Sequence, residues 1–259
     1  MIQISKYIEF ANTLADLSET VIKKYFRNFG QAIQKSDLSP VTVADREAEQ
    51  VMRQAIEKHF PEHGIIGEEF GIKESNSSYY WVLDPIDGTA SFIIGRPMFG
   101  TLIALVKDND FLIGIINQPI LHERWLGVAG QKSVMNKKNI HASNCTKLSE
   151  AIICTTGPQY FKDGKIKYFD AVRNQAKQVV YGGDCYNYGL LACGFVDIVI
   201  ESSLKFHDFA ALIPVLQGAG AMVSDWQGNQ LNPESNGDIL IAATKELHEQ
   251  ALALLNQAS

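Results

Sequence analysis

The sequence has few cysteines, and their arrangement does not suggest a cross-linked or zinc-binding protein. The four cysteines among 259 residues form no CxxC pair and lack the density of a disulfide scaffold: Cys145, Cys154, Cys185 and Cys193. No Cys/His cluster has the spacing of a zinc site. The chain also lacks an N-terminal basic region followed by an apolar core, so we predict no signal peptide and a reducing, cytoplasmic location.

Further absences limit the partners. Every apolar stretch is interrupted well short of the ~20 residues that a membrane span requires. The net charge of −6 offers no basic surface to nucleic acid or to an anionic membrane, so neither is expected as a main partner. No linker, repeat or low-complexity tract divides the chain. With 46% hydrophobic and 20% charged residues, the composition is that of a globular protein with a substantial core.

Hydrophobic periodicity predicts helices first and strands afterwards. We expect a long amphipathic helix over residues 7–25 and a second helix that follows Thr42 and ends near Pro61. Strands are expected at 79–83, 99–106 and 111–117, the last two joined as a hairpin. After about residue 140 we expect further strands at 151–155, 196–200, 221–224 and 239–243, and helices at 186–191 and 209–216. Helices and strands in mixed order indicate an α/β fold.

The segment Trp81–Thr89 (WVLDPIDGT) is the most informative part of the chain. Its first three residues predict a buried strand that ends at Asp84, and Pro85 stiffens the following turn by fixing φ near about −65°. Asp84 and Asp87 can then point at one spot, which suits cations. Gly88-Thr89 would let an oxyanion approach the main chain beside a hydroxyl group. The alternative is an ordinary strand-to-turn corner, since Asp-Pro and Asp-Gly are common turn dipeptides.

Other acids extend this pattern. Glu68-Glu69 lies in a loop between glycines, where two adjacent carboxylates repel one another unless a cation neutralises them. Asp208 precedes a segment with helical spacing and could equally be a helix N-cap. We interpret His207, its neighbour, as a packing or supporting residue. Oxygen ligands alone favour a hard cation, Mg²⁺ before Zn²⁺.

Three motifs in this order resemble those of the inositol monophosphatase-like metal-dependent phosphatases: Gly67-Glu68-Glu69, Trp81–Thr89, and a late block from Gly182 through Asp208 to Gly220. The resemblance covers nearly the whole chain. Within that family, residues 92–105 and 181–191 resemble the histidinol-phosphatase branch most. Two positions depart from that branch: Ala90 replaces a frequent basic residue, and Phe206-His207 replaces a frequent Pro-Tyr pair.

The resemblance implies an α/β (α+β) fold, a five-layer αβαβα sandwich of the inositol monophosphatase/fructose-1,6-bisphosphatase type. Residues 1–140 would form an N-terminal α+β half that carries most metal ligands. Residues 141–259 would form a C-terminal α/β half that supplies Asp208 and the substrate contacts. The family is commonly homodimeric, so we expect a homodimer.

The resemblance also implies a role for each site residue. Glu68, Asp84 and the carbonyl of Ile86 would hold one Mg²⁺, and Asp84, Asp87 and Asp208 a second. A third, weaker Mg²⁺ would bind near Glu68. Catalysis would rest on Glu68, Asp45 and Thr89, the last two orienting or deprotonating a water that attacks the phosphate directly. The substrate would contact the residues Gly88, Thr89, Asp184, Glu201 and Asp208.

Several of these residues have a purely structural alternative. Asp45 lies three residues after Thr42, as in a capping arrangement at a helix start. Asp184 could cap a helix after the Gly-Gly pair, and Glu201 could be an exposed charge at a strand end. The functional interpretation is that Asp184 and Glu201 face the part of the substrate remote from the phosphate. A buried carboxylate is costly without a partner, so Asp184 in particular suits an ammonium group.

The expected function is hydrolysis of a small phosphate ester by a Mg²⁺-dependent phosphomonoesterase. The substrate would be L-histidinol phosphate, released as L-histidinol plus phosphate in histidine biosynthesis. An alternative with the same chemistry is inositol 1-phosphate or another sugar-alcohol or nucleotide phosphate. A third hypothesis is a non-catalytic regulatory interaction protein. That hypothesis predicts a missing ligand, yet the expected residues are all present: Glu68, Asp84, Asp87, Thr89 and Asp208.

Overall fold

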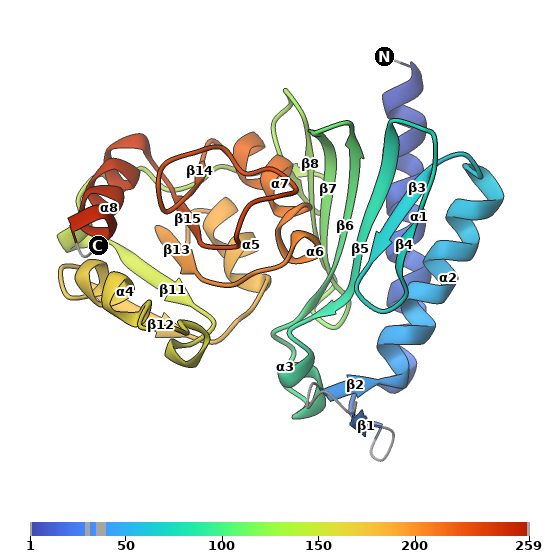
Figure 1. Ribbon diagram of the computed structural model, residues 1–259, viewed down its shortest axis with the longest axis horizontal. Helices are drawn as coiled ribbons and strands as arrows, with labels where there is room; N and C mark the ends of the chain where they lie inside the picture. Colours follow the sequence, from blue (N-terminus) through green and yellow to red (C-terminus); the bar gives the residue numbers. More distant parts are fainter. Residues whose placement is uncertain (1, 29–31, 35–39, 258–259) are drawn as a thin grey trace.

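Two β-sheets alternate with three layers of helices in the computed structural model, which describes residues 2–28, 32–34 and 40–257 (Figure 1). The chain begins with α1 (Ile2–Tyr25) and α2 (Val43–His59), and both predicted N-terminal helices are thereby confirmed. Between them, the short strands β1 (Ala32–Gln34) and β2 (Pro40–Thr42) pair with each other. Among the described helices, none is both long and apolar enough to cross a membrane.

The first large sheet has eight strands, and α1 and α2 pack on one of its faces. Its spatial order is β10-β9-β8-β7-β6-β5-β3-β4, with β3 parallel to β5 and the other pairs antiparallel. The predicted hairpin is confirmed as β6 and β7. The strands are β3 (Gly64–Gly67), β4 (Gly71–Lys73), β5 (Tyr79–Asp87), β6 (Gly100–Lys107), β7 (Asp110–Gln118), β8 (Glu123–Val128), β9 (Val134–Met135) and β10 (Lys138–Asn139).

The second sheet has five strands in the order β12-β11-β13-β15-β14. Helices α5 and α7 lie between the two sheets with α6 beside them, while α4 and α8 cover the outer face (Figure 1). This arrangement confirms the predicted α/β fold with five αβαβα layers. The elements are β11 (Ile152–Thr155), α4 (Ile166–Arg173), β12 (Gln178–Tyr181), α5 (Tyr186–Ala192), β13 (Ile198–Glu201), α6 (Phe206–Phe209), α7 (Leu212–Gly218), β14 (Met222–Asp225), β15 (Ile239–Ala242) and α8 (Lys245–Gln257).

A pair of glycines lets the central helix layer approach the first sheet closely. Gly114 of β7 and Gly127 of β8 are opposite each other in the register. A Cβ atom at Gly114 would lie 1.9 Å from the carbonyl oxygen of Ala211, and one at Gly127 would lie 2.3 Å from the carbonyl carbon of Pro214. Helix α7 therefore packs against the sheet at the level of the main chain. The division into halves at residue 140 stays a prediction.

Two local predictions are wrong. The helix expected over 209–216 is divided into α6 and α7, because Pro214 has no N–H to donate to the carbonyl of Ala210 one turn earlier. Asp84 does not end its strand, since β5 continues to Asp87. Pro85 interrupts the hydrogen-bond ladder there without ending the strand, and a bulge results.

Candidate active site

The bulge in β5 brings two carboxylates to the same face of the sheet. Along a regular strand, residues an odd number apart point to opposite faces. Asp84 is opposite Leu102 and Asp87 is opposite Gly100, so β5 carries one residue more than β6 over this stretch. The extra residue restores Asp87 to the face of Asp84. The structure thus achieves by a bulge what the sequence predicted from a turn.

Hydrogen bonds from several elements hold the bulge in place. The Thr101 hydroxyl donates to the carbonyl of Pro85 at 2.8 Å and lies 2.9 Å from the hydroxyl of Ser18 on α1. The Thr89 hydroxyl donates to the carbonyl of Ile86 at 3.0 Å. The main-chain N–H of Cys185 donates to Asp87 Oδ2 at 2.5 Å, which joins the bulge to the start of α5. The two acids are therefore positioned before any ligand binds.

Glu68 reaches the same place along a neighbouring strand. Strands β3 and β5 are parallel, with Gly67 in register with Leu83, and the Glu68 N–H donates to the Leu83 carbonyl at 3.2 Å. Since carboxyl ends of parallel strands meet at one edge of a sheet, Glu68 lies next to Asp84.

Glu49 on α2, an acid that the sequence analysis missed, holds the turn after Glu68 in place. The Glu49 side chain is fully buried and accepts hydrogen bonds from the N–H of Glu69 at 2.7 Å and of Phe70 at 3.2 Å, and from Arg53 Nε at 2.7 Å. A Cβ atom at Gly67 would lie 1.9 Å from Glu49 Oε1, so a glycine is required there. Glu49 lies four residues after Asp45 and therefore on the same face of α2, and this spacing could have indicated from the sequence that Glu49 faces the site.

Replacing Glu49 by glutamine is expected to weaken cation binding without preventing folding. An amide makes weaker hydrogen bonds than a carboxylate to the two N–H groups, so the turn that carries Glu68 is held less firmly. Loss of such an outer-shell partner costs about tenfold or more in metal affinity. The Mg²⁺ concentration that half-saturates the thermal shift should rise by about that factor. Glu57→Gln, at an exposed position of the same helix, is the matched control, and equal Mg²⁺ responses of the two variants would contradict this role of Glu49.

The C-terminal half contributes His207 and Asp208 from α6, which packs against β5. Asp208 is the third residue of α6, whose N-cap is Lys205, so the N-cap alternative for Asp208 is wrong. Its Oδ2 accepts the N–H of Lys205 at 2.7 Å as one half of a capping box. Its other oxygen, Oδ1, lies 3.4 Å from Nε2 of His207. Asp208 therefore helps to cap the helix and also lies among the acids of β5.

The described residues form two overlapping groups of possible cation ligands. One oxygen each of Asp84, Asp87 and Asp208 lie within 4.8 Å of one another, and so do ligand atoms of Glu68, Asp84 and His207. Asp84 belongs to both groups. Its side chain is 1% exposed, and its Oδ1 has no hydrogen-bond partner. A buried carboxylate oxygen without a donor is costly in a protein interior, and a cation would satisfy it.

The crowding of these acids perturbs their titration. Burial, followed by the charges of Glu68, Asp87 and other nearby acids, raises the pKa of Asp84 well above its usual range. Burial is also the main cause that raises the pKa of Asp208 to about 6 and that raises the pKa of Glu68. All these shifts disfavour the charged form, as expected when cations are absent from such a site. The carboxylates present therefore fit a site for hard cations.

The predicted catalytic residues lie beside this cluster. Asp45 is buried on the first turn of α2, and its charge is one of those that raise the pKa of Asp84. The side chain of Thr42, its proposed capping partner, lies outside the described residues. Thr89 is the first residue of α3 (Thr89–Ile93), and its hydroxyl contacts the Ile86 carbonyl.

Among the predicted substrate residues, Asp184 lies beside Gly88, whereas Glu201 lies at the end of β13. A Cβ atom at Gly88 would lie 2.9 Å from Oδ2 of Asp184, so Asp184 lies directly beside the Gly-Thr segment. Asp184 accepts a hydrogen bond from the Ser91 hydroxyl at 3.0 Å and adopts a left-handed backbone conformation with φ of 45°. It precedes α5, while Gly88 flanks α3, so the two segments are far apart in sequence.

Glu201 has a different environment. It is 1% exposed at the end of β13, so the alternative of an exposed strand-end charge is wrong. Its carboxylate accepts hydrogen bonds from the Thr155 hydroxyl at 3.1 Å and from the N–H and hydroxyl of Thr156 at 2.6 and 2.9 Å. Burial, as the main cause, raises the pKa of Glu201 to about 7. Tyr160, which the sequence reasoning missed, is partly exposed near Asp184, whose charge contributes to raising the pKa of Tyr160.

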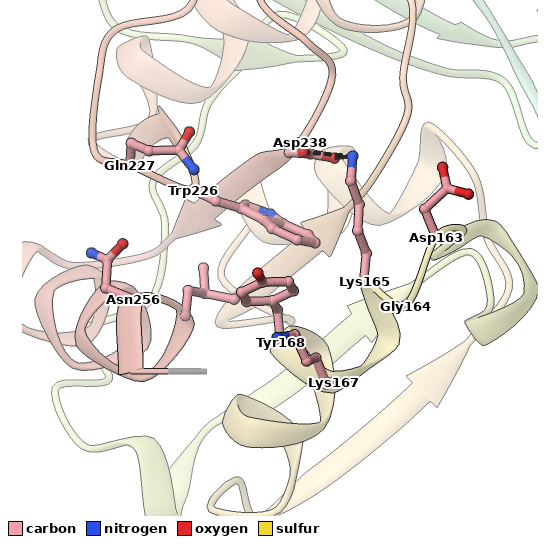
Figure 2. A pocket seen from close by; sticks show the side chains of 10 residues that line it. Asp163, Gly164, Lys165, Lys167, Tyr168, Trp226, Gln227, Asp238 and Asn256 are labelled. Carbon is pink, nitrogen blue, oxygen red and sulfur yellow. Dashed lines mark hydrogen bonds and ion pairs between the residues drawn. The ribbon is translucent and has the colours of Figure 1, made fainter. Parts of the chain in front are cut away.

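A pocket of about 530 Å³ on the outer side of the second sheet offers no comparable chemistry. It lies between α4, α8 and the segments around Trp226 and Asp238 (Figure 2). Lys165 Nζ is 2.8 Å from both carboxylate oxygens of Asp238, so the buried charge of Asp238 is neutralised by a partly exposed lysine. The ring of Tyr168 packs against Trp226 with centroids 5.5 Å apart. The acid cluster is therefore the candidate active site.

An αβαβα sandwich with convergent carboxylates at the carboxyl ends of β3 and β5 is the arrangement expected of a metal-dependent phosphoric monoester hydrolase. A sequence profile described as the inositol monophosphatase family matches residues 3–259. The chain belongs to that family, whose members are phosphatases.

Individual relatives have different names. The chain is 45% identical to the chloroplastic bifunctional phosphatase IMPL2 of Arabidopsis thaliana, over 98% of this chain and 76% of that protein. It is 33% identical to a histidinol-phosphatase of Chlorobaculum parvum, over 96% of each. An inositol monophosphatase structure from Zymomonas mobilis superposes with a TM-score of 0.90 at 45% identity, covering 97% of this chain and 98% of that one. The relatives share the class of reaction but not one named substrate.

Proposed function

We propose that the protein is a Mg²⁺-dependent phosphomonoesterase that hydrolyses L-histidinol phosphate to L-histidinol and phosphate. The observation that carries the metal-dependent chemistry is the convergence of Asp84, Asp87 and Asp208, with Glu68 alongside and one buried Asp84 oxygen lacking a hydrogen-bond partner. Two cations would be held, one by Glu68, Asp84 and the Ile86 carbonyl, the other by Asp84, Asp87 and Asp208. A third would bind more weakly near Glu68.

When bound, Mg²⁺ would supply an activated water and neutralise charge that develops on the phosphate. The chain's own groups would do the rest. The main-chain N–H groups of Gly88 and Thr89 would bind phosphate oxygens, and Asp45 with the Thr89 hydroxyl would orient the water and accept its proton. The hydrogen bond from Thr89 to Ile86 keeps this hydroxyl beside the bulge.

The choice of histidinol phosphate rests on Asp184. This carboxylate abuts Gly88, so it lies where the leaving group of a phosphate bound at Gly88-Thr89 would extend. Burial is the main cause that raises the pKa of Asp184, and the Ser91 hydroxyl and the charge of Arg96 offset it only in part, so the carboxylate gains from a further cationic partner. Histidinol phosphate has an amine that can be this partner, whereas inositol phosphate has only hydroxyl groups. The named histidinol-phosphatase relative supports the same choice.

A second substrate is favoured by a separate observation, because the Zymomonas mobilis protein of 45% identity is named as an inositol monophosphatase. The same acids would serve inositol 1-phosphate or another sugar-alcohol or nucleotide phosphate. The non-catalytic hypothesis is disfavoured by the complete set of carboxylates. A homodimer and a cytoplasmic location stay predictions.

The test is phosphate release with Mg²⁺ from L-histidinol phosphate, inositol 1-phosphate, a nucleotide bisphosphate and a sugar phosphate. We expect kcat/KM to be highest for histidinol phosphate. Replacing Asp184 by asparagine should lower that value by about a hundredfold, the order expected when a charged hydrogen-bond partner is lost. Turnover of inositol phosphate should change by less than about tenfold. Asp163→Asn, at an exposed loop position, is the matched control.

Preference for inositol phosphate in wild type would overturn the choice of substrate and leave the class of reaction intact. An equal loss for both substrates in Asp184→Asn would instead assign Asp184 to the phosphate end of the site.

A further inference from the structure

We propose that His207 supplies a nitrogen ligand to a cation held with Glu68 and Asp84, so that this position prefers Co²⁺ or Zn²⁺ to Mg²⁺. The inference rests on the proposed function, because it concerns one of the cation positions of the same site. It goes further by making the two positions chemically unlike. The position of Asp84, Asp87 and Asp208 would have carboxylate oxygens alone, and the position of Glu68 and Asp84 would add an imidazole.

The geometry places the imidazole among the acids. A ring nitrogen of His207 and one oxygen each of Glu68 and Asp84 lie within 4.8 Å of one another, a spacing that a single ion can bridge. The His207 side chain is only 12% exposed, so the ring lies inside the protein and not in solvent. Its Nε2 is 3.4 Å from Asp208 Oδ1, which shows that the ring edge faces the cluster.

A separate observation supports a cation beside Asp84, which is shared by both groups. Asp84 belongs to the group with His207, and its buried Oδ1 accepts no hydrogen bond. A cation between Asp84 and His207 would satisfy both a carboxylate oxygen and an imidazole lone pair.

The kind of ligand decides which ion is favoured. Mg²⁺ prefers oxygen ligands, while imidazole suits transition ions such as Co²⁺ and Zn²⁺. The group of Asp84, Asp87 and Asp208 contains only oxygen donors and keeps its preference for Mg²⁺. Since Asp84 is shared, the site would hold one hard and one borderline ion side by side.

The test uses Co²⁺ as the probe. The protein is first freed of bound metal with a chelator, Mg²⁺ is then supplied, and one equivalent of Co²⁺ is added. Proton NMR should show the strongly shifted, exchangeable N–H resonance of a Co²⁺-bound imidazole. His207→Phe keeps the ring shape and removes the donor, so this resonance should disappear. Calorimetric affinity for Co²⁺ should fall by about tenfold or more, at least the loss seen for weaker outer-shell partners. Affinity for Mg²⁺ should change by less than about twofold, since the oxygen ligands remain.

His122→Gln is the control for adventitious binding, because His122 is exposed, and it should leave the resonance unchanged. His207→Gln repeats the removal of the imidazole with a polar side chain, in case phenylalanine disturbs packing. Co²⁺ bound to wild type without an imidazole resonance, or a resonance that survives both His207 variants, would overturn the role of His207. If neither Mg²⁺ nor Co²⁺ binds wild type any better than Asp84→Asn, the proposed function itself fails.

Discussion

Replacing Asp84 by asparagine is expected to reduce phosphate release by about a thousandfold or more while leaving the protein folded. Asp84 is common to both groups of ligand atoms, and no other acid among the described residues belongs to both. An asparagine keeps the size of the side chain but loses the negative charge that two cations would share. Cation stabilisation of a phosphoryl transition state is worth several kcal/mol, and about 4 kcal/mol corresponds to a thousandfold in rate.

The same substitution is expected to raise the melting temperature of the metal-free protein. Wild type holds a buried carboxylate whose pKa is raised by burial and by its acidic neighbours, and an amide removes this cost. Mg²⁺ should then raise the melting temperature of the variant far less than that of wild type. Phosphate release and thermal melting with and without chelator measure both effects. Asp163→Asn is the control, and a variant that keeps activity within tenfold of wild type would refute a central role for Asp84.

The stability of the metal-free protein is expected to fall as the pH rises from about 4 to 7, and Mg²⁺ should reduce the part of this fall that comes from the acids of the site. A carboxyl group whose pKa is raised in the folded state binds more protons there than in the unfolded chain. Stability is therefore greatest below the ordinary pKa and is lost as the pH rises through the folded value. For Asp208 this window runs from 3.8 to about 6, and for Glu201 from 4.5 to about 7.

The size of the effect follows from the shift at Asp208. A shift from 3.8 to about 6 corresponds to about 3 kcal/mol, or roughly 6 °C in a chain of this length. Bound Mg²⁺ keeps the site acids ionised, so its stabilisation should be larger at the upper end of the range than at the lower end. Thermal melts across this range in chelator and in saturating Mg²⁺ test this. Asp208→Asn should flatten the slope, while Asp110→Asn in the exposed hairpin turn should not. A Mg²⁺ gain that is largest at low pH would contradict the model of crowded acids.

The sequence predicted elements well where periodicity alone determines them. The first two helices and the β6–β7 hairpin are confirmed, because each has an apolar face or alternation that one partner can cover. Helix α8 was missed, although Leu247, Ala251 and Leu255 recur at helical spacing and are buried. Strand β3 was not predicted, since four residues bounded by glycines give too short a pattern.

Some residues of the site could be predicted from the local sequence, and others could not. Asp84 and Asp87 stand out locally because Pro85 separates them by a fixed geometry. Glu68 and Asp208 were candidates from the sequence, but only the resemblance assigned them to one site with Asp84, since their proximity depends on how β3 and α6 pack against β5. His207 was interpreted as a supporting residue, because nothing in the sequence indicates which way its ring points. The bulge that aligns the two aspartates also depends on the β6 register, which no local pattern reveals.

The paired glycines of the first sheet affect how closely acidic side chains from different layers approach one another. Gly114 and Gly127 present only hydrogen atoms to the main chain of Ala211 and Pro214, at the start of α7. Asp208 lies just before this contact, whereas Asp84 belongs to the sheet on which the helix rests. Because Gly114 and Gly127 carry no side chain, α7 lies close to the first sheet. This close contact limits the distance between Asp208 and the acids of β5. Electrostatic repulsion among these acids acts against this contact in the metal-free protein, and bound cations would oppose that repulsion.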